Sequence, residues 1–568
     1  MEWWTCVVLL CVTAVLADDE WREVRLAQGP VRGRKHHNGG LYTFYNIPYA
    51  AAPAGENKFK EPLPPPTWTA PFDAIDDHIV ICPQNDAIFQ SVPVTVEMKE
   101  DCLTANVLVP DTTEKNLSVL VYTHGGGFST GFGNSITGTQ FIKEKKDVIM
   151  VSFNYRLGIH GFLCLGTEDA PGNAGLKDQL ALLRWVQDNI ASFGGNPDDV
   201  TLAGFSAGSA LVDVLMLSKI TEGLFHRVIP ESAGNLAVLT FQRDPLEIAR
   251  TFAKDHNFAN VDDINALEQF YKTASMDLLT ASTFDNGTDS TFMFTPCVER
   301  DIDGAILTES PLTILKTGNY KKLPMLFGFT NMEGLLRIGF FETWQHLMNE
   351  NFSDFLPGDL KFESEEEREE VANTVKKYYF GDNPVGNDTV LNYVDFFSDV
   401  MFTYPMLRAV QLHAEAGNNQ VYLYEYSFVD EDVPPVPYTD VRGANHCAQA
   451  WAWLDGSDES LETPEFQKMR KIVRDIWYNF IKTGEPIPEG SSLPAWPAAG
   501  ANRSPHMVLD ENVELRGGLL EERFNFWNDI YQRYYLDSVP PRTGLSAFLS
   551  HFFCISCKIN IIYHSVLE

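Results

Sequence analysis

The pentapeptide Gly-Phe-Ser-Ala-Gly at residues 204–208 restricts the fold of this chain more than any other feature. It follows the apolar run 200–203 and precedes a segment, ending near Leu217, whose composition suits a helix. A serine on a sharp strand-to-helix turn needs flanking residues without a Cβ, because backbone passes close to backbone there. The pattern predicts a strand, a tight turn and a helix, with Ser206 at the carboxyl end of the strand. An ordinary turn is the alternative for the pentapeptide alone.

A run of three glycines after a second predicted strand is the next constraint. Residues 118–122 are Ser-Val-Leu-Val-Tyr, typical of a buried strand, and residues 124–128 are His-Gly-Gly-Gly-Phe. Acyl transfer builds negative charge on a carbonyl oxygen, which fixed backbone N–H groups stabilise. Such a turn lets an ester approach its backbone closely, so we expect an oxyanion hole made by the amides of Gly126, Gly127 and Ala207. A flexible surface loop is the alternative.

A nucleophilic serine needs a base and an acid that orients the base. In strand-turn-helix sites of this kind they follow the serine in the order acid, then histidine. Glu333 lies just after the apolar run 323–328, and His446 lies in a glycine-containing loop after the predicted strand 421–426. We therefore expect Glu333 to be the orienting acid and His446 the general base.

Other histidines fit this order less well. His124 and His160 precede Ser206, and His226 follows it too closely to leave room for the acid. The chain has 13 histidines, so the alternative for His446 is a histidine packed in the core or exposed at the surface. The alternative for Glu333 is an ordinary solvated acid, since acids are plentiful in this chain.

Four longer motifs identify a family. They are Glu-Asp-Cys-Leu at 100–103, Asn-Tyr-Arg-Leu-Gly at 154–158, Pro-Gly-Asn-Ala-Gly-Leu-Lys-Asp-Gln at 171–179 and Phe-Gly-Gly-Asn-Pro at 193–197. With these motifs, residues 24–535 resemble a type-B carboxylesterase, from the cholinesterase-like branch of the α/β-hydrolases. Within that family the chain is most similar to secreted insect carboxylesterases, the group that includes juvenile hormone esterases and antennal odorant-degrading esterases.

The resemblance implies an α/β-hydrolase fold, with a large, mostly parallel central sheet covered by helices on both faces. It also implies a carboxylic ester hydrolase that uses Ser206, Glu333 and His446 and needs no cofactor or metal. The family's first disulfide would join Cys82 to Cys102. Cys164, Cys297 and Cys447 have no obvious partners in the sequence, and we expect buried thiols there.

Three positions depart from the family pattern. Phe205 stands where juvenile hormone esterases typically have Gln, which disfavours a hormone-specific enzyme. Gln449 stands where the family often has an acid; an amide there can still form hydrogen bonds but changes the local charge. The stretch 83–101 lacks the tryptophan on which cholinesterases stack choline, so acetylcholine is not an expected substrate.

The predicted catalytic residues are spread from residue 206 to residue 446, so one large domain must bring them together. No linker or repeat interrupts the chain, and 44% hydrophobic residues suffice for a large core. We expect one domain at residues 18–536 and a disordered extension at 537–568. The Cys554 and Cys557 pair in that extension lacks a thioredoxin-like context, so no redox role is expected.

The beginning of the chain predicts export. Residues 7–16 are an apolar segment too short to span a bilayer, and a small-residue cleavage site precedes Asp18, so residues 1–17 read as a signal peptide. The net charge of −34 argues against nucleic acid and anionic membranes as partners. We expect a secreted, extracellular protein without stable membrane insertion; the oligomeric state is not predicted. Sequons for glycosylation stand at Asn116, Asn286, Asn351, Asn387 and Asn502.

These patterns together predict a secreted serine carboxylesterase that acts on small neutral esters, in the clearance of xenobiotics or of odorant and pheromone esters. A juvenile hormone esterase is one alternative. An adhesion protein of the neuroligin type is the alternative from another class, since that fold also occurs in binding proteins that have lost the serine. Here the serine, the acid and the histidine are all present.

Overall fold

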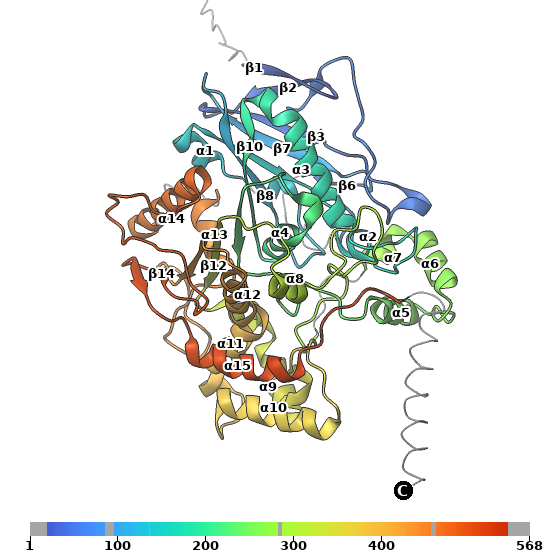
Figure 1. Ribbon diagram of the computed structural model, residues 1–568, viewed down its shortest axis with the longest axis vertical. Helices are drawn as coiled ribbons and strands as arrows, with labels where there is room; N and C mark the ends of the chain where they lie inside the picture. The colour runs from blue at the N-terminus through green and yellow to red at the C-terminus, as the bar shows by residue number, and fades with distance from the viewer. Residues whose placement is uncertain are drawn as a thin grey trace, which may run out of the picture.

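The structure is a computed structural model that describes residues 20–542, apart from residues 76, 86–95, 136, 282–286 and 456–461. A 13-stranded sheet runs through the molecule in the order β1-β2-β3-β7-β9-β8-β10-β11-β12-β13-β14-β15, with β4 beside β2 (Figure 1). The middle of this sheet is parallel, and its two ends are antiparallel. The expected α/β-hydrolase fold is confirmed, and the antiparallel ends make the sheet a mixed one.

The parallel strands coincide with the apolar runs of the sequence, because strands buried on both faces need apolar side chains throughout. They are β8 (Leu117–Thr123), β9 (Val148–Phe153), β10 (Gly195–Phe205), β11 (Arg227–Glu231), β12 (Met325–Thr330), β13 (Val421–Tyr426) and β14 (His506–Leu509). The other strands are β1 (Trp21–Leu26), β2 (Gly29–Lys35), β3 (Leu41–Pro48), β4 (Phe72–Asp73), β7 (Thr104–Pro110) and β15 (Glu514–Arg516), with β5 (Ile79–Ile81) and β6 (Val96–Met98) in a small separate sheet.

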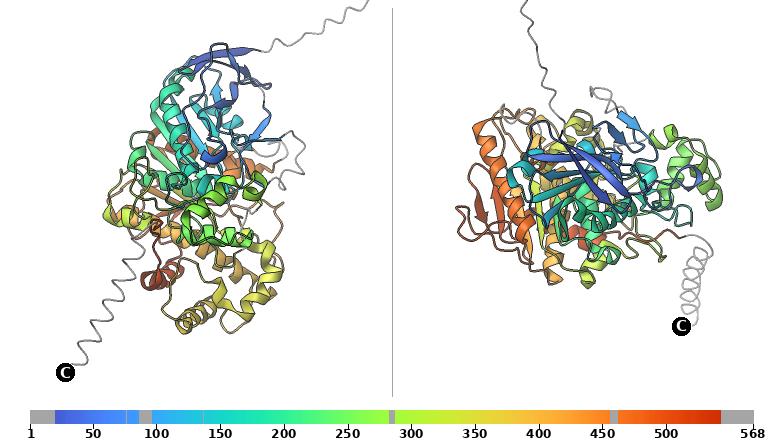
Figure 2. Two further views of the ribbon diagram at one scale, coloured as in Figure 1. Left: turned by 90° about the vertical axis from the view of Figure 1, so that its right-hand side faces the viewer. Right: turned by 90° about the horizontal axis from the view of Figure 1, so that it is seen from above.

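Each face of the sheet has its own apolar core. Along β8, Val119 and Val121 belong to one core, whereas Leu120 and Tyr122 belong to the other, as the alternation of side chains in a strand requires. The first core takes in α3 (Ala174–Phe193), α4 (Ala207–Leu217) and α12 (Tyr404–Glu415). The second takes in α1 (Thr139–Lys145), α13 (Ala448–Trp453) and α14 (Pro464–Thr483), which lie on the opposite side of the sheet from α3 (Figure 2).

The remaining helices contribute side chains to the first core. They are α2 (Gly158–Phe162), α5 (Pro245–Asp255), α6 (Ile264–Thr273), α7 (Met276–Thr280), α8 (Pro311–Thr317), α9 (Phe341–Glu350), α10 (Glu365–Phe380), α11 (Val390–Ser398) and α15 (Glu521–Tyr534). In the part of the chain that the structure describes, no helix combines the length and the apolar character that a membrane span requires.

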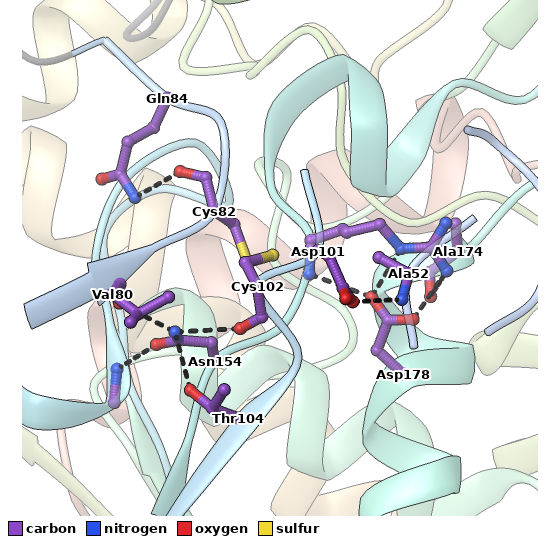
Figure 3. The surroundings of a disulfide bond; sticks show 12 residues. Ala52, Val80, Cys82, Gln84, Asp101, Cys102, Thr104, Asn154, Ala174 and Asp178 are labelled. Carbon is purple, nitrogen blue, oxygen red and sulfur yellow. Dashed lines mark hydrogen bonds and ion pairs between the residues drawn. A yellow bond between two sulfur atoms is a disulfide. The ribbon is translucent and has the colours of Figure 1, made fainter. Parts of the chain in front are cut away.

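The disulfide between Cys82 and Cys102 is present, as expected (Figure 3). Asn154 fixes the backbone beside it, since its side-chain amide donates to the carbonyl oxygens of Val80 at 2.8 Å and Cys102 at 3.1 Å. A buried ion pair lies close by, between Arg156 and Asp178 at 2.6 Å. Three of the four long motifs, at 100–103, 154–158 and 171–179, thus meet in one place, where they hold together the segments after β5, β6 and β9.

The expectation of unpaired thiols at two positions is wrong. Cys164 and Cys297 form a second disulfide that joins segments 133 residues apart in the sequence. Sequence spacing could not reveal this pair, because only the folded chain brings the two residues within bonding distance. Cys447 is a free, buried cysteine, as expected.

The predicted C-terminal extension begins with residues that the fold holds in place. Asp537 accepts a hydrogen bond from Ser310 at 2.6 Å, and Ser538 accepts one from Arg243 at 2.6 Å. The rest of the extension from residue 543, with Cys554 and Cys557, lies outside the described residues, as do the predicted signal peptide and Asn286.

Candidate active site

Ser206 lies on the predicted turn between β10 and α4, with φ 53° and ψ −129°. This φ is uncommon for a residue with a side chain and marks a strained turn. The neighbouring glycines make the turn possible: a Cβ on Gly208 would lie 2.3 Å from the carbonyl oxygen of Thr123, and one on Gly204 would lie 2.9 Å from the same atom. The Ser206 N–H donates to the carbonyl oxygen of Glu231 at 2.8 Å, which ties the turn to β11.

The three residues expected to form a catalytic triad meet at this turn. His446 Nε2 lies 2.8 Å from Ser206 Oγ, and His446 Nδ1 lies 2.5 Å from Glu333 Oε2. Glu333 is fully buried, whereas the His446 side chain is 9% exposed and Ser206 is half-buried. The histidine therefore bridges a buried carboxylate and a hydroxyl that a substrate can reach.

The second oxygen of Glu333 is held by a hydrogen-bond network. Glu333 Oε1 accepts from Ser232 Oγ at 2.6 Å and from the Thr330 N–H at 2.8 Å. Ser232 accepts in turn from the side-chain amide of Gln449 at 2.6 Å. Gln449, which stands where the family often has an acid, therefore has a role in the structure. Its side-chain amide holds Ser232, and Ser232 holds Glu333.

The contact of Ser232 with Glu333 was not predicted from the sequence. The only local signal was the place of Ser232 directly after the buried strand β11.

The glycine run after β8 packs directly against Ser206. A Cβ on Gly125 would lie 3.0 Å from the Cβ of Ser206. Gly126 and Gly127 have φ of 110° and 59°, which favours glycine at both. Ala207 is the first residue of α4, so its N–H has no acceptor within the helix. The three amides predicted to form an oxyanion hole thus belong to segments that meet at Ser206.

The rings of the other histidines considered above make different contacts. His124 is buried and stacks on Tyr155, with a ring separation of 4.4 Å. Burial lowers the pKa of His124 to about 4 and that of His160 to about 3. His226 accepts a hydrogen bond from the Val200 N–H at 3.1 Å.

Two phenylalanines lie beside His446 and Ser206. Phe402 packs on the His446 ring, with ring centres 4.4 Å apart. It lies on a π-helical turn (Asp399–Thr403) between α11 and α12, and such turns often occur at functional sites. Phe205 directly precedes the nucleophile and is half-buried. Sequence reasoning missed Phe402, because no local pattern shows which distant helix covers the histidine.

A second buried carboxyl group belongs to Glu231, whose backbone carbonyl accepts the hydrogen bond from the Ser206 N–H. Glu231 is fully buried, accepts a hydrogen bond from the Tyr424 hydroxyl and is approached by the indoles of Trp453 and Trp477. Burial raises the pKa of Glu231 to about 8, and the nearby Glu333 carboxylate adds to this rise. Burial also raises the pKa of the Cys447 thiol well above its usual value. Within the described ranges, no group of three or more His, Cys, Asp or Glu side chains could hold a metal ion.

Comparisons with known proteins identify the family. The sequence profile of the Carboxylesterase family matches residues 20–527. The chain is 32% identical to the juvenile hormone esterase of Heliothis virescens, over 83% of this chain and 87% of the relative. It is 30% identical to a carboxylic ester hydrolase of Bombus ignitus, over 89% and 94% of the two chains.

The fold is also similar to a solved structure. The crystal structure of juvenile hormone esterase from Manduca sexta, with OTFP covalently attached, matches 90% of this chain and 100% of that chain, with a TM-score of 0.79 and 29% identity. The chain therefore belongs to the carboxylesterase family and is a carboxylic ester hydrolase.

Proposed function

We propose that this chain is a secreted serine carboxylesterase that hydrolyses neutral carboxylic esters through an acyl-enzyme on Ser206. The observation that carries the proposal is the continuous chain of contacts from Ser206 Oγ through the His446 ring to the buried Glu333 carboxylate. This geometry supplies a nucleophile, a base within hydrogen-bond reach and an acid that orients the base.

The first half of the reaction forms the acyl-enzyme. His446 Nε2 takes the Ser206 proton as Oγ attacks the ester carbonyl carbon. The amides of Gly126, Gly127 and Ala207 stabilise the oxyanion; loss of one such donor typically costs about 10²- to 10³-fold in kcat. The protonated His446 then gives its proton to the alcohol, which leaves.

The second half of the reaction releases the acid. A water molecule gives a proton to His446 Nε2 and attacks the acyl carbon, and the same amides stabilise the second oxyanion. Collapse of this intermediate returns the proton to Ser206 Oγ. Glu333 stays ionised throughout and stabilises the positively charged ring of His446.

Three features support secretion. The predicted signal peptide precedes the described chain, and two disulfides suit an oxidising compartment. The four described asparagines in glycosylation sequons are all exposed: Asn116, Asn351, Asn387 and Asn502. We propose that these sites carry glycans.

Clearance of xenobiotic or odorant esters is the proposed biological role, with juvenile hormone hydrolysis as the second candidate. The second candidate is favoured by the relatives named juvenile hormone esterase, and Phe205 beside the nucleophile disfavours it. Acetylcholine remains an unexpected substrate. The adhesion alternative has least support, because His446 lies within hydrogen-bond distance of both Ser206 and Glu333.

Hydrolysis of a series of neutral esters with acyl chains of increasing length tests this proposal. The secreted protein would be assayed on acetate to long-chain acyl esters and on a juvenile hormone analogue, with and without an organophosphate. We expect turnover that the organophosphate abolishes, with the phosphoryl group found on Ser206 by mass spectrometry. Preference for the hormone analogue over the simple esters would favour the second candidate. Absence of both turnover and phosphorylation would favour a binding protein.

A further inference from the structure

Three aromatic rings form a row that leads from the interior of the protein to its surface beside Ser206. Tyr122 is fully buried and stacks on Phe205, with ring centres 6.2 Å apart and an angle of 19° between the planes. Phe205 in turn contacts Trp451, with ring centres 6.2 Å apart. Trp451 is 46% exposed, although it contacts the residue that directly precedes Ser206.

The Phe205 ring lies beside the glycine run of the predicted oxyanion hole. Its Cε2 atom lies 3.0 Å from the position that a Cβ on Gly125 would take, so the ring borders the glycine run. Tyr122 supports the ring from the interior. Phe205 still remains half-buried, so part of it is available for contact.

The position of Trp451 indicates which part of an ester these rings meet. Trp451 lies on α13, which begins two residues after His446. His446 gives its proton to the departing alcohol, so the alcohol must lie on the histidine side of Ser206. Phe205 and Trp451 therefore border the space of the alcohol rather than that of the acyl group.

We propose that Phe205 and Trp451 form an aromatic subsite for the alcohol part of the substrate, which selects esters of flat, aromatic alcohols. The proposal rests on the function proposed above for Ser206. Aromatic pairs are attracted by about 0.5–1.5 kcal/mol beyond the effect of buried area, which corresponds to about 2- to 12-fold in kcat/KM. A saturated ring of the same size gains the buried area but not this attraction.

Benzyl acetate and cyclohexylmethyl acetate test the subsite, because they differ only in the aromaticity of the alcohol ring. We expect the wild-type protein to prefer benzyl acetate. Trp451→Ala should lower the ratio of the two kcat/KM values about 3- to 10-fold, and Trp451→Phe should restore most of it. Phe205→Leu, which keeps an apolar side chain, should lower the ratio by a similar factor.

A matched pair on the acyl side separates the two halves of the substrate. For methyl phenylacetate and methyl cyclohexylacetate, the ratio in Trp451→Ala should equal that of the wild type. Trp21→Ala is the control variant, since Trp21 is similarly exposed, at 44%, but lies on β1 at the edge of the sheet. It should leave both ratios unchanged.

The outcomes distinguish the two proposals. If the variants hydrolyse these esters with the wild-type benzyl ratio, or change only the acyl ratio, the subsite is refuted while the esterase function stands. If the wild-type protein hydrolyses none of the esters and does not react with an organophosphate, the proposed function fails and the subsite fails with it.

Discussion

Single residues at this site depend on partners that come from distant parts of the chain. The sequence alone predicts a triad of Ser206, Glu333 and His446. Each of them follows an apolar strand, a glycine stands near each, and they occur in the order serine, acid, histidine. The sequence does not predict that Ser232 and Phe402 belong to this site. Their contacts with Glu333 and His446 exist only once separate loops and helices have packed together.

The buried Glu231 leads to a prediction about pH and stability. Burial raises the pKa of this carboxyl to about 8 in the folded protein, whereas in the unfolded chain it has its ordinary value of 4.5. Between these values the folded state holds a proton that the unfolded state has lost, so the free energy of unfolding falls as the pH rises through this window. In Glu231→Gln this pH-dependent decrease in the free energy of unfolding, on the order of a few kcal/mol, should be absent.

Thermal unfolding midpoints measured from pH 5 to pH 9 check this prediction. The wild type should lose more stability across the range than Glu231→Gln does. Glu431→Gln changes an exposed carboxyl instead and should keep the wild-type slope. Equal slopes in the wild type and Glu231→Gln would show that the Glu231 carboxyl is ionised in the folded protein at neutral pH.

At the scale of elements, the sequence predicted the strands and helices around the nucleophile well. The predicted strands 118–122 and 421–426 correspond to β8 and β13, and the helix expected up to Leu217 is α4. Strong apolar patterns and glycine turns explain this agreement. The antiparallel ends of the sheet were not predicted, because alternation within a strand does not reveal the direction of its neighbour.

The turn at Ser206 gives a prediction at this scale. A Cβ on Gly208 would lie 2.3 Å from the carbonyl oxygen of Thr123 and 2.6 Å from that of His124, both of them backbone atoms of the adjoining segment. Gly208→Ala should therefore push α4 away from β8, lower the free energy of unfolding by about 1–3 kcal/mol and displace Ser206. We expect a lower unfolding midpoint and a loss of ester hydrolysis.

Gly517→Ala is the matched control, because no heavy atom lies within 4 Å of the position of its added Cβ. It should keep the wild-type midpoint and activity. A Gly208→Ala protein with wild-type stability and turnover would show that the close packing of the turn is not required.

At the scale of the whole molecule, contacts between distant segments hold the two sides of the site together. His446 and Ser206 are 240 residues apart in the sequence, and the disulfide between Cys164 and Cys297 spans 133 residues. The sequence indicated that one fold must unite the catalytic residues. It could not pair these two cysteines, since the distance between them depends on the folded chain.

This second disulfide carries a prediction for the stability of the molecule. A cross-link stabilises mainly by restricting the unfolded chain, and more so for a long loop. Replacing both cysteines with serine should lower the free energy of unfolding by about 2–5 kcal/mol, as measured by chemical denaturation. Unchanged stability in the double variant, relative to the oxidised wild-type protein, would contradict the pairing.

Ser206 is proposed to carry the acyl group, and hydrolysis of 4-nitrophenyl acetate by the wild-type protein and by Ser206→Ala tests this role. The variant should keep its unfolding midpoint, because a hydroxyl on a half-buried turn contributes little to packing. Its kcat should fall about 10⁴- to 10⁶-fold, the loss expected when a serine nucleophile is removed. A correctly folded Ser206→Ala protein that hydrolyses the ester at the wild-type rate would show that Ser206 does not carry the acyl group.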